Sequence, residues 1–228
     1  MTRSKPPFMT FGLVSVLLLA GCATETHRAV APAHTASAGT AYSGERYTLV
    51  VGKFENRSTY LRGIFSDGVD RLGSQSKTIL KTHLQETNRF VVVDRANMDE
   101  IAREAEIRGA EQALKGAQVV LTGDVTEFGR KETGDVALFG ILGAGKQQVA
   151  YAKVALNVVD VRTSEILFSA QGAGEFALSN RQVLGTGGAA GYDATLNGKV
   201  LDLAIREAVE RLVEGLEAGA WQPSAGNR

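Results

Sequence analysis

The sequence has few of the residues from which catalytic and metal-binding sites are built. Its 228 residues include one cysteine and three histidines. A single cysteine excludes a disulfide within the chain and a metal site made of several thiolates. His27, His34 and His83 are scattered, so neither a histidine metal site nor a serine–histidine triad has enough partners. We therefore expect no enzymatic activity, no metal and no cofactor.

Excess charge and long apolar runs are missing as well. Basic and acidic residues both number 25, which excludes the strongly basic surface of a nucleic-acid-binding protein, so we expect no nucleic-acid partner. The apolar run from Phe8 to Leu19 is too short to cross a bilayer as a helix. It follows the basic residues Arg3 and Lys5 and precedes small residues, which is the layout of a secretory signal.

The one cysteine stands directly behind this run, in a tetrapeptide Leu-Ala-Gly-Cys that ends at Cys22. The tetrapeptide resembles a bacterial lipobox, which implies that residues 1–21 are a lipoprotein signal and that Cys22 is acylated. Each acyl methylene group that is buried in a membrane contributes about 0.8 kcal/mol, so the acyl chains would hold the protein on the membrane. Ala23 replaces the aspartate that retains lipoproteins at the inner membrane, so we expect the outer membrane. The alternative is an ordinary cleaved signal followed by a free cysteine.

Behind the signal, composition divides the chain into a tether and one domain. Residues 22–45 are rich in Ala, Thr, Ser and Gly and show neither helical nor strand periodicity, which is typical of a flexible tether. Residues 46–221 have the length of a single domain with a two-layer core. Residues 222–228 remain as a C-terminal tail.

Strand patterns alternate with helix patterns in the domain. Short β-branched runs, or alternation of apolar and polar residues, predict strands, whereas apolar residues three or four positions apart predict helices. The whole pattern indicates an α/β (α+β) fold, with a mixed sheet packed by about three helices. The predicted strands are 47–54, 90–93, 119–125, 149–161 and 166–176, and the predicted helices are 65–84, 98–109 and 200–216.

A glycine-rich stretch at 140–146 fits the first seven positions of a phosphate-binding loop. Gln147 stands where that loop needs a serine or threonine hydroxyl for magnesium. The residues that follow have the pattern of a strand, whereas a phosphate-binding loop opens a helix. We therefore interpret 140–146 as the tip of a glycine-rich hairpin.

Four sequence blocks, in their order and spacing, carry a family resemblance. They are Val50–Arg57, Phe90–Arg95 with Met98, Ile101 and Glu104, Gly116–Gly123, and Leu156–Ile166. They resemble blocks of the outer-membrane lipoproteins of the curli secretion channel and holdfast attachment (the CsgG/HfaB family). Asp94 stands where a glutamate is usual in that family. The resemblance covers nearly all of the mature chain.

The resemblance implies a ring of identical subunits. Each subunit of the channel-forming members gives two β-hairpins to one oligomeric transmembrane β-barrel, and by position these are segments 128–154 and 168–196. The alternative is that both segments remain soluble sheet, because their apolar bands are thin for strands that face lipid.

The resemblance also implies that the loop at 56–66 narrows the conduit. Tyr60, Ile64 and Phe65 stand at the spacing of the family's constriction residues, although Ile64 replaces an asparagine. Rings of Tyr and Phe would grip an unfolded polypeptide without reading its sequence. The alternatives are that Tyr60 is an exposed loop aromatic and that Phe65 is the first core residue of the following helix.

These features predict an outer-membrane lipoprotein, lipid-anchored on the periplasmic face of a Gram-negative envelope, that acts in export or assembly of extracellular fibre or adhesin proteins. The implied partners are further copies of the chain, the secreted polypeptide and periplasmic accessory proteins. A second hypothesis is a periplasmic lipoprotein without a pore that binds and regulates an envelope enzyme such as a cell-wall synthase. A secreted hydrolase is disfavoured because the sequence offers no set of nucleophile, base and orienting group.

Overall fold

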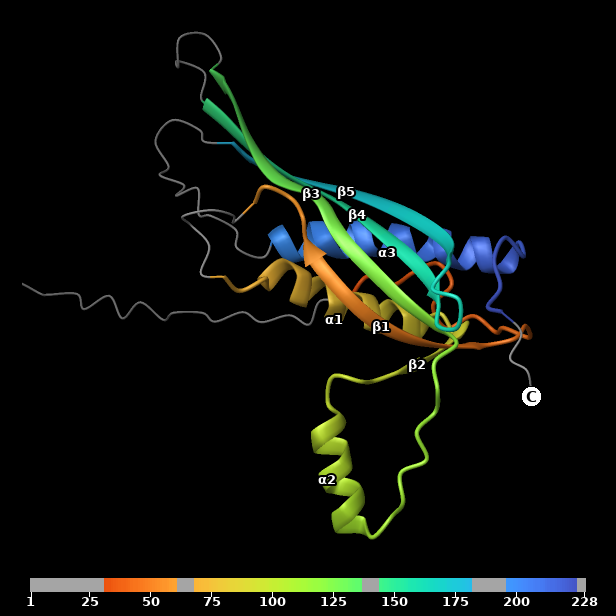
Figure 1. Ribbon diagram of the computed structural model, residues 1–228. Helices are drawn as coiled ribbons and strands as arrows, with labels where there is room; N and C mark the ends of the chain where they lie inside the picture. Colours follow the sequence, from red (N-terminus) through yellow and green to blue (C-terminus); the bar gives the residue numbers. More distant parts are fainter. Residues whose placement is uncertain (1–30, 61–67, 137–143, 182–195, 225–228) are drawn as a thin grey trace, which may run out of the picture. The chain divides into compact units, whose positions relative to one another are not determined.

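The computed structural model describes residues 31–60, 68–136, 144–181 and 196–224 (Figure 1). Within these ranges strands and helices alternate through the first half of the chain and three long strands follow in succession. In chain order the elements are β1 (Tyr47–Asn56), α1 (Arg71–Glu86), β2 (Phe90–Val93), α2 (Met98–Arg108), β3 (Val119–Val136), β4 (Ala144–Asp160), β5 (Ile166–Arg181) and α3 (Leu196–Glu217).

The strands form one mixed five-stranded sheet in the order β2-β1-β3-β4-β5. β1 runs parallel to β2 and β3, whereas β3, β4 and β5 pair antiparallel. The expected α+β fold with a mixed sheet and three helices is confirmed. β3 and β4 pair from Val119 and Asp160 to Val136 and Ala144, across the segment 128–154 assigned to the first hairpin. β5 covers the first part of segment 168–196, and residues 182–195 lie outside the described residues.

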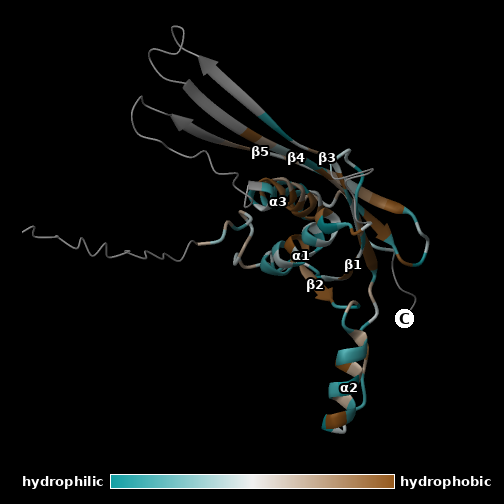
Figure 2. Ribbon diagram, turned by 90° about the vertical axis from the view of Figure 1, so that its left-hand side faces the viewer, coloured by the Kyte–Doolittle hydropathy of each residue, from teal (hydrophilic) through white to brown (hydrophobic). Residues whose placement is uncertain are grey.

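The two faces of the sheet differ, as the alternation in the sequence predicts. α1 packs on β1 and β2, α3 packs on β4 and β5, and the two helices contact each other on the same side of the strands (Figure 2). On β4 every second residue faces this helical layer and is buried, whereas the residues between them face outward. The buried apolar residues of β4 are Ala150, Ala152, Val154, Leu156 and Val158, and the outward residues include Tyr151, Lys153 and Asn157.

The core lies between the sheet and α3, whose predicted apolar stripe is confirmed. α3 approaches β5 closely because Gly172 and Gly174 carry no side chain. A Cβ at Gly172 would overlap the carbonyl oxygen of Ala204, and one at Gly174 would lie 2.7 Å from the Cβ of Leu203. The buried stripe of α3 is Val200, Leu201, Ala204, Ile205, Ala208, Val209, Leu212, Val213 and Leu216.

The start of α1 differs from the prediction. The sequence pattern places it at residue 65, but the helix begins at Arg71, and Val69, expected on the buried stripe, is 60% exposed. Gly68 has a positive φ of 79°, which a right-handed helix cannot contain, and the Asp70 side chain caps the first turn by accepting from the backbone N–H of Gly73. Later members of the stripe, such as Leu80, are buried as predicted.

α2 is the one helix in the described ranges that buries none of its residues. It covers the predicted range and ends at Gly109, which adopts the left-handed conformation typical of a helix C-terminus. Its apolar residues stay on the surface, and Ile107 is 73% exposed. An isolated helix of this length is marginal in water, so α2 depends on its ends for support.

The C-terminal residues are part of the fold. Trp221 is buried, and its ring lies 6.1 Å from the ring of Tyr47 and 6.3 Å from that of Phe90. Beyond it, the backbone N–H of Ser224 donates to Asp160 at 2.7 Å. This bond, together with backbone donors in the β4–β5 turn, lowers the pKa of the Asp160 carboxyl. The expected C-terminal tail is therefore fixed to the sheet at its first residues.

Two general properties concern the described ranges. None of their helices combines the length and the apolar composition that a membrane-spanning helix needs. No three His, Cys, Asp or Glu side chains in these ranges are grouped as metal ligands would be.

The glycine-rich stretch at 140–146 is described only in part. Residues 137–143 lie outside the described residues, and Lys146 is a residue of β4. A strand therefore follows the stretch, as predicted for a hairpin tip.

Candidate functional site

The loop behind β1, which contains the predicted constriction residues, opens with a tight turn built by Asn56. Its side-chain oxygen accepts from the backbone N–H of Ser58 at 3.0 Å and from the Ser58 hydroxyl at 2.6 Å. Its side-chain nitrogen donates to the carbonyl oxygen of Tyr60 at 2.9 Å. Asparagine favours such turns because its short side chain can bond the backbone two residues ahead.

The far end of the same loop is fixed by Asp70. One carboxylate oxygen accepts from the backbone N–H of Asn56 at 2.7 Å, and the other accepts from Gly73 at the first turn of α1, also at 2.7 Å. A single side chain therefore ties the end of β1 to the start of α1. The loop is closed at its base, whatever the conformation of the residues between.

Tyr60 lies against the body of its own subunit. Its ring centroid is 4.7 Å from that of Phe128 on β3, at an interplanar angle of 56°. Its hydroxyl accepts from the side-chain N–H of Asn197 in the first turn of α3, at 3.4 Å. The Asn197 oxygen in turn accepts from Arg130 of β3 at 2.9 and 2.6 Å. Tyr60 is thus half-buried in contacts with two other elements.

The outward side of the loop carries a row of ion pairs. Arg57 donates to Asp124 of β3 at 2.9 Å and to Glu55 at 3.0 Å, and Glu55 also pairs with Lys53. The hydrogen bond from Lys53 and the nearby charge of Arg57 lower the pKa of Glu55, and the bond to Asp124 raises the pKa of Arg57. The two basic side chains are well exposed and the two carboxylates are partly exposed, so these ion pairs orient the base of the loop more than they stabilise the fold.

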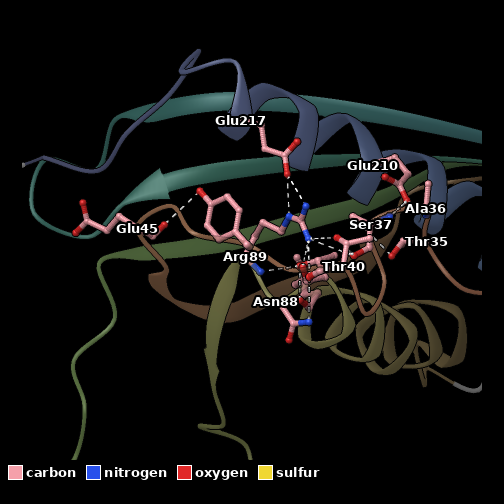
Figure 3. Close-up of polar contacts among 12 residues, drawn as sticks. Thr35, Ala36, Ser37, Thr40, Glu45, Asn88, Arg89, Glu210 and Glu217 are labelled. Carbon is pink, nitrogen blue, oxygen red and sulfur yellow. Dashed lines mark hydrogen bonds and ion pairs between the residues drawn. The ribbon is translucent and has the colours of Figure 1, made fainter.

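A second polar cluster holds residues 35–42, here called the N-terminal strap, against the domain (Figure 3). Arg89, directly before β2, is buried and donates to the carbonyl oxygen of Ser37 at 3.2 Å and to the hydroxyl of Thr40. It also donates twice to Glu217 of α3, at 2.9 and 2.7 Å. Its guanidinium carbon lies 5.0 Å from the centre of the Tyr42 ring.

The strap is fixed at its other end by α1 and α3. Glu210 of α3 accepts from the backbone N–H groups of Ala36 and Ser37, and His34 contacts Glu86 of α1 at 3.0 Å. Figure 3 shows Glu210 and Glu217 reaching from α3 to the two ends of this cluster. Residues 34–42 thus differ from the expectation of a flexible tether throughout 22–45. Their polar composition gives no periodicity, but their backbone groups are bonded to buried or partly buried side chains.

A family model described as "Curli production assembly/transport component CsgG" matches residues 34–227. The chain belongs to the CsgG family. The match begins at His34, which contacts Glu86 of α1, and so includes the strap, the loop behind β1 and all eight described elements.

A sequence relative and several solved structures resemble this CsgG-family chain. A protein of Neisseria meningitidis serogroup B named "Putative lipoprotein NMB1126/NMB1164" is 63% identical over 206 residues, covering 90% of this chain and 92% of the relative. Among solved structures, the PelC dodecamer from Paraburkholderia phytofirmans is 14% identical, covers 72% of this chain and 87% of its own, and has a TM-score of 0.35. Lipoprotein GNA1162 from N. meningitidis is 15% identical, covers 76% and 99%, and has a TM-score of 0.36. The two structures are too distant to support a functional argument.

Of the predicted site residues, the described part of the chain contains Tyr60. Cys22, Ile64 and Phe65 lie outside the described residues. The structure joins Tyr60 to Arg130 and Asn197, neither of which the sequence analysis identified. The sequence does contain one indication that Arg130 has a buried partner. Arg130 is a charged residue at a position of β3 that the alternation assigns to the helical face, two residues after buried Phe128.

Proposed function

We propose that this CsgG-family chain is a lipid-anchored outer-membrane lipoprotein on the periplasmic face, and that it forms an oligomeric assembly for export of extracellular fibre or adhesin proteins. The family match carries the proposal, since it spans the whole folded part of the chain. Two further observations support lipidation at Cys22: the lipobox-like tetrapeptide and the lipoprotein name of the relative that is 63% identical over 206 residues.

Export through such an assembly would make and break no covalent bonds. The assembly would only have to position the passing polypeptide and to select it by size. The loop behind β1 has the properties of a rigidly based constriction, because Asp70 closes it and Asn56 sets its entry. We assign Tyr60 to positioning the loop, since its ring and hydroxyl both contact the same subunit. Ile64 and Phe65 are assigned to contact with the passing polypeptide.

Self-assembly is supported by the edge of β3 beyond Val125. β1 pairs with β3 only as far as Val125, so within the described residues no strand pairs with β3 from Thr126 to Val136 on that side. Unpaired strand edges of this length readily accept a strand from another chain. A neighbouring copy, joined in a ring, would satisfy these backbone groups. Periplasmic accessory proteins would then act on the assembled ring.

The full-length, lipidated protein purified in mild detergent tests this proposal. We expect a particle with the mass of a multi-subunit ring and stepwise conductance when it is added to a planar lipid bilayer. Phe65→Ala should raise the single-channel conductance because it removes a large side chain from the narrowest part. Tyr42→Ala, which removes an aromatic side chain from the strap, should leave conductance unchanged. A monomer that never conducts would contradict the channel.

The contacts of Tyr60 favour one second candidate. A pore-facing tyrosine needs no partner in its own subunit, yet Tyr60 packs on Phe128 and bonds Asn197. These contacts are equally compatible with a lipoprotein without a pore that binds and regulates an envelope enzyme such as a cell-wall synthase. Capture of such an enzyme by the monomeric, non-conducting protein would establish that function in place of export.

A further inference from the structure

β5 is the outer strand of the sheet, and its middle is suited to accept another strand. Ala173, Gly174 and Glu175, here called the β5 edge, pair with β4 on one side. On the other side no strand lies beside them among the described residues. Natural sheet edges are commonly protected by lysine, proline or a covering segment. The β5 edge has two small residues and one glutamate instead.

Two pockets meet at the β5 edge, one on each face of the sheet. The first, of about 480 Å³, lies on the helical side and is also lined by His34, Leu203, Arg206, Glu207 and Glu210. The second, of about 500 Å³, lies on the outward side and is also lined by Glu127, Lys131, Val149, Tyr151 and Lys153. Both are lined by all three residues of the β5 edge.

This arrangement matches the geometry of an added strand. Side chains alternate between the two faces of a strand, and residues directly opposite each other on paired strands point to the same face. Gly174 belongs to the helical face, because a Cβ there would meet Leu203 and Val200 of α3. A residue paired with Gly174 would therefore point into the helical-side pocket, and its two neighbours would point into the outward pocket. Leu203, which is partly exposed, would be covered.

The two pockets differ in chemistry. The helical-side pocket has the carboxylates of Glu207 and Glu210 against the guanidinium of Arg206, with Glu175 at its rim; Glu207 is also paired with Arg211, which lies outside the pocket lining, so Glu210 and Glu175 leave the pocket acidic. Glu210 accepts from backbone N–H groups of the strap, which carry no charge to neutralise it. This pocket suits a basic side chain. In the outward pocket the Tyr151 ring lies over Gly129 of β3, beside Lys131, so the surface next to an added strand is the small side chain of Ala173, which suits an apolar neighbour.

We propose that the β5 edge binds an extended segment of another polypeptide as a sixth strand, with a lysine or arginine directed toward Glu207 and Glu210 and apolar residues packed beside Ala173 on the outward face. Backbone hydrogen bonds would supply most of the affinity, and the two pockets would select the alternating pattern. The inference does not depend on the export function, since a strand can bind this edge in a ring subunit or in a monomer.

A short fluorescent peptide in which lysine and valine alternate is the probe. Its binding to the full-length protein in mild detergent is followed by fluorescence anisotropy. We expect saturable binding, and slower amide hydrogen exchange in β5 between Phe168 and Ala177 when the peptide is bound, because an added strand would bond the edge backbone. No binding up to about 1 mM would overturn the proposal, and so would binding that leaves exchange in β5 unchanged.

Charge reversal at one position tests the direction of the basic side chains. Glu207→Lys should weaken binding of the lysine–valine peptide by about fivefold to tenfold, because an attraction becomes a repulsion. It should also strengthen binding of a glutamate–valine peptide. Glu214→Lys is the matched control, since Glu214 is exposed on the same helix but lines neither pocket. Equal effects of the two substitutions would show that net charge alone governs binding and would overturn the assigned orientation.

Discussion

At the scale of single residues, Arg89 joins parts of the chain that are far apart in sequence. Its side chain is 8% exposed and links β2 to the strap and to Glu217 of α3. Removing one member of a buried ionic cluster is costly because its partners lose their bonds. We expect Arg89→Met to lower the free energy of unfolding by about 2–3 kcal/mol in urea titrations.

The control for Arg89 is another Arg–Glu contact of the same chain. Arg211 donates to Glu207 at 2.8 Å, but both side chains are about half-exposed. Arg211→Met should therefore change the unfolding free energy by less than about 0.5 kcal/mol. If Arg89→Met and Arg211→Met lowered the unfolding free energy by similar amounts, the bonds of Arg89 to the strap would stabilise the fold no more than an exposed ion pair does.

Asp94 gives a residue-scale prediction that depends on pH. The backbone N–H of Ala96 and the side chains of Lys81 and Asn97 bond its carboxylate and lower its pKa to about 2. Because the pKa is lower in the folded state, the ionised carboxylate stabilises the fold above about pH 4, and this stabilisation is lost as pH falls through about 2. The side chain is partly exposed, so screening reduces the effect to about 1 kcal/mol.

Urea titrations at two pH values measure the Asp94 contribution. Asp94→Asn should be less stable than the natural chain at pH 7 by about 1 kcal/mol, and the two should converge near pH 2. Asp99→Asn, on exposed α2, is the control. A difference between Asp94→Asn and the natural chain that persists unchanged at low pH would point to a steric effect instead.

At the scale of elements, the close contact of α3 with β5 is the most demanding feature. A Cβ at Gly172 would overlap the carbonyl oxygen of Ala204 and lie 2.5 Å from the backbone nitrogen of Ala208. Neither is the end of a flexible side chain, so α3 would have to move. We expect Gly172→Ala to lower the unfolding free energy by about 2–3 kcal/mol, measured by chemical denaturation. Gly116→Ala, where nothing lies within 4 Å of the added methyl, should be nearly neutral.

Most elements could be predicted from local patterns, and the misses have physical causes. β2 and α2 were predicted to within a residue, because a β-branched run and a glycine C-cap are local signals. β3 continues well beyond the predicted end at 125, to Val136, through a polar and glycine-rich stretch, because β4 pairs with it there. Pairing across a sheet is a property of two segments, and neither sequence shows it alone.

The candidate sites were less predictable than the elements. The loop behind β1 was identified through a family resemblance, but the contacts of Tyr60 with Phe128 and Asn197 join residues far apart in sequence. The strap was missed because its backbone is held by Arg89 and Glu210 from other elements. Such contacts leave no periodic pattern in the segment that receives them.

At the scale of the whole molecule, the strap determines where the proposed lipid anchor joins the domain. Twelve residue steps lead from Cys22 to His34, and they span about 40 Å at most when fully extended. The contacts of His34 with Glu86 and of Ser37 with Glu210 place the first residues of the domain beside α1 and α3. Lipidation at Cys22 would therefore hold this end of the domain within that distance of the membrane.

Cys22→Ser tests the anchor directly. Without the thiol no acyl chain can be attached, so the variant should take up no labelled palmitate and should move from the membrane fraction to the soluble fraction. Its unfolding free energy should be unchanged, since residue 22 precedes residues 34–227, which the family model matches. Ala23→Asp is the matched variant: it should keep the label but shift the protein to the inner membrane. If Cys22→Ser remained in the membrane fraction, the lipid would not be what holds the protein there, and the attachment would have to come from the oligomer itself.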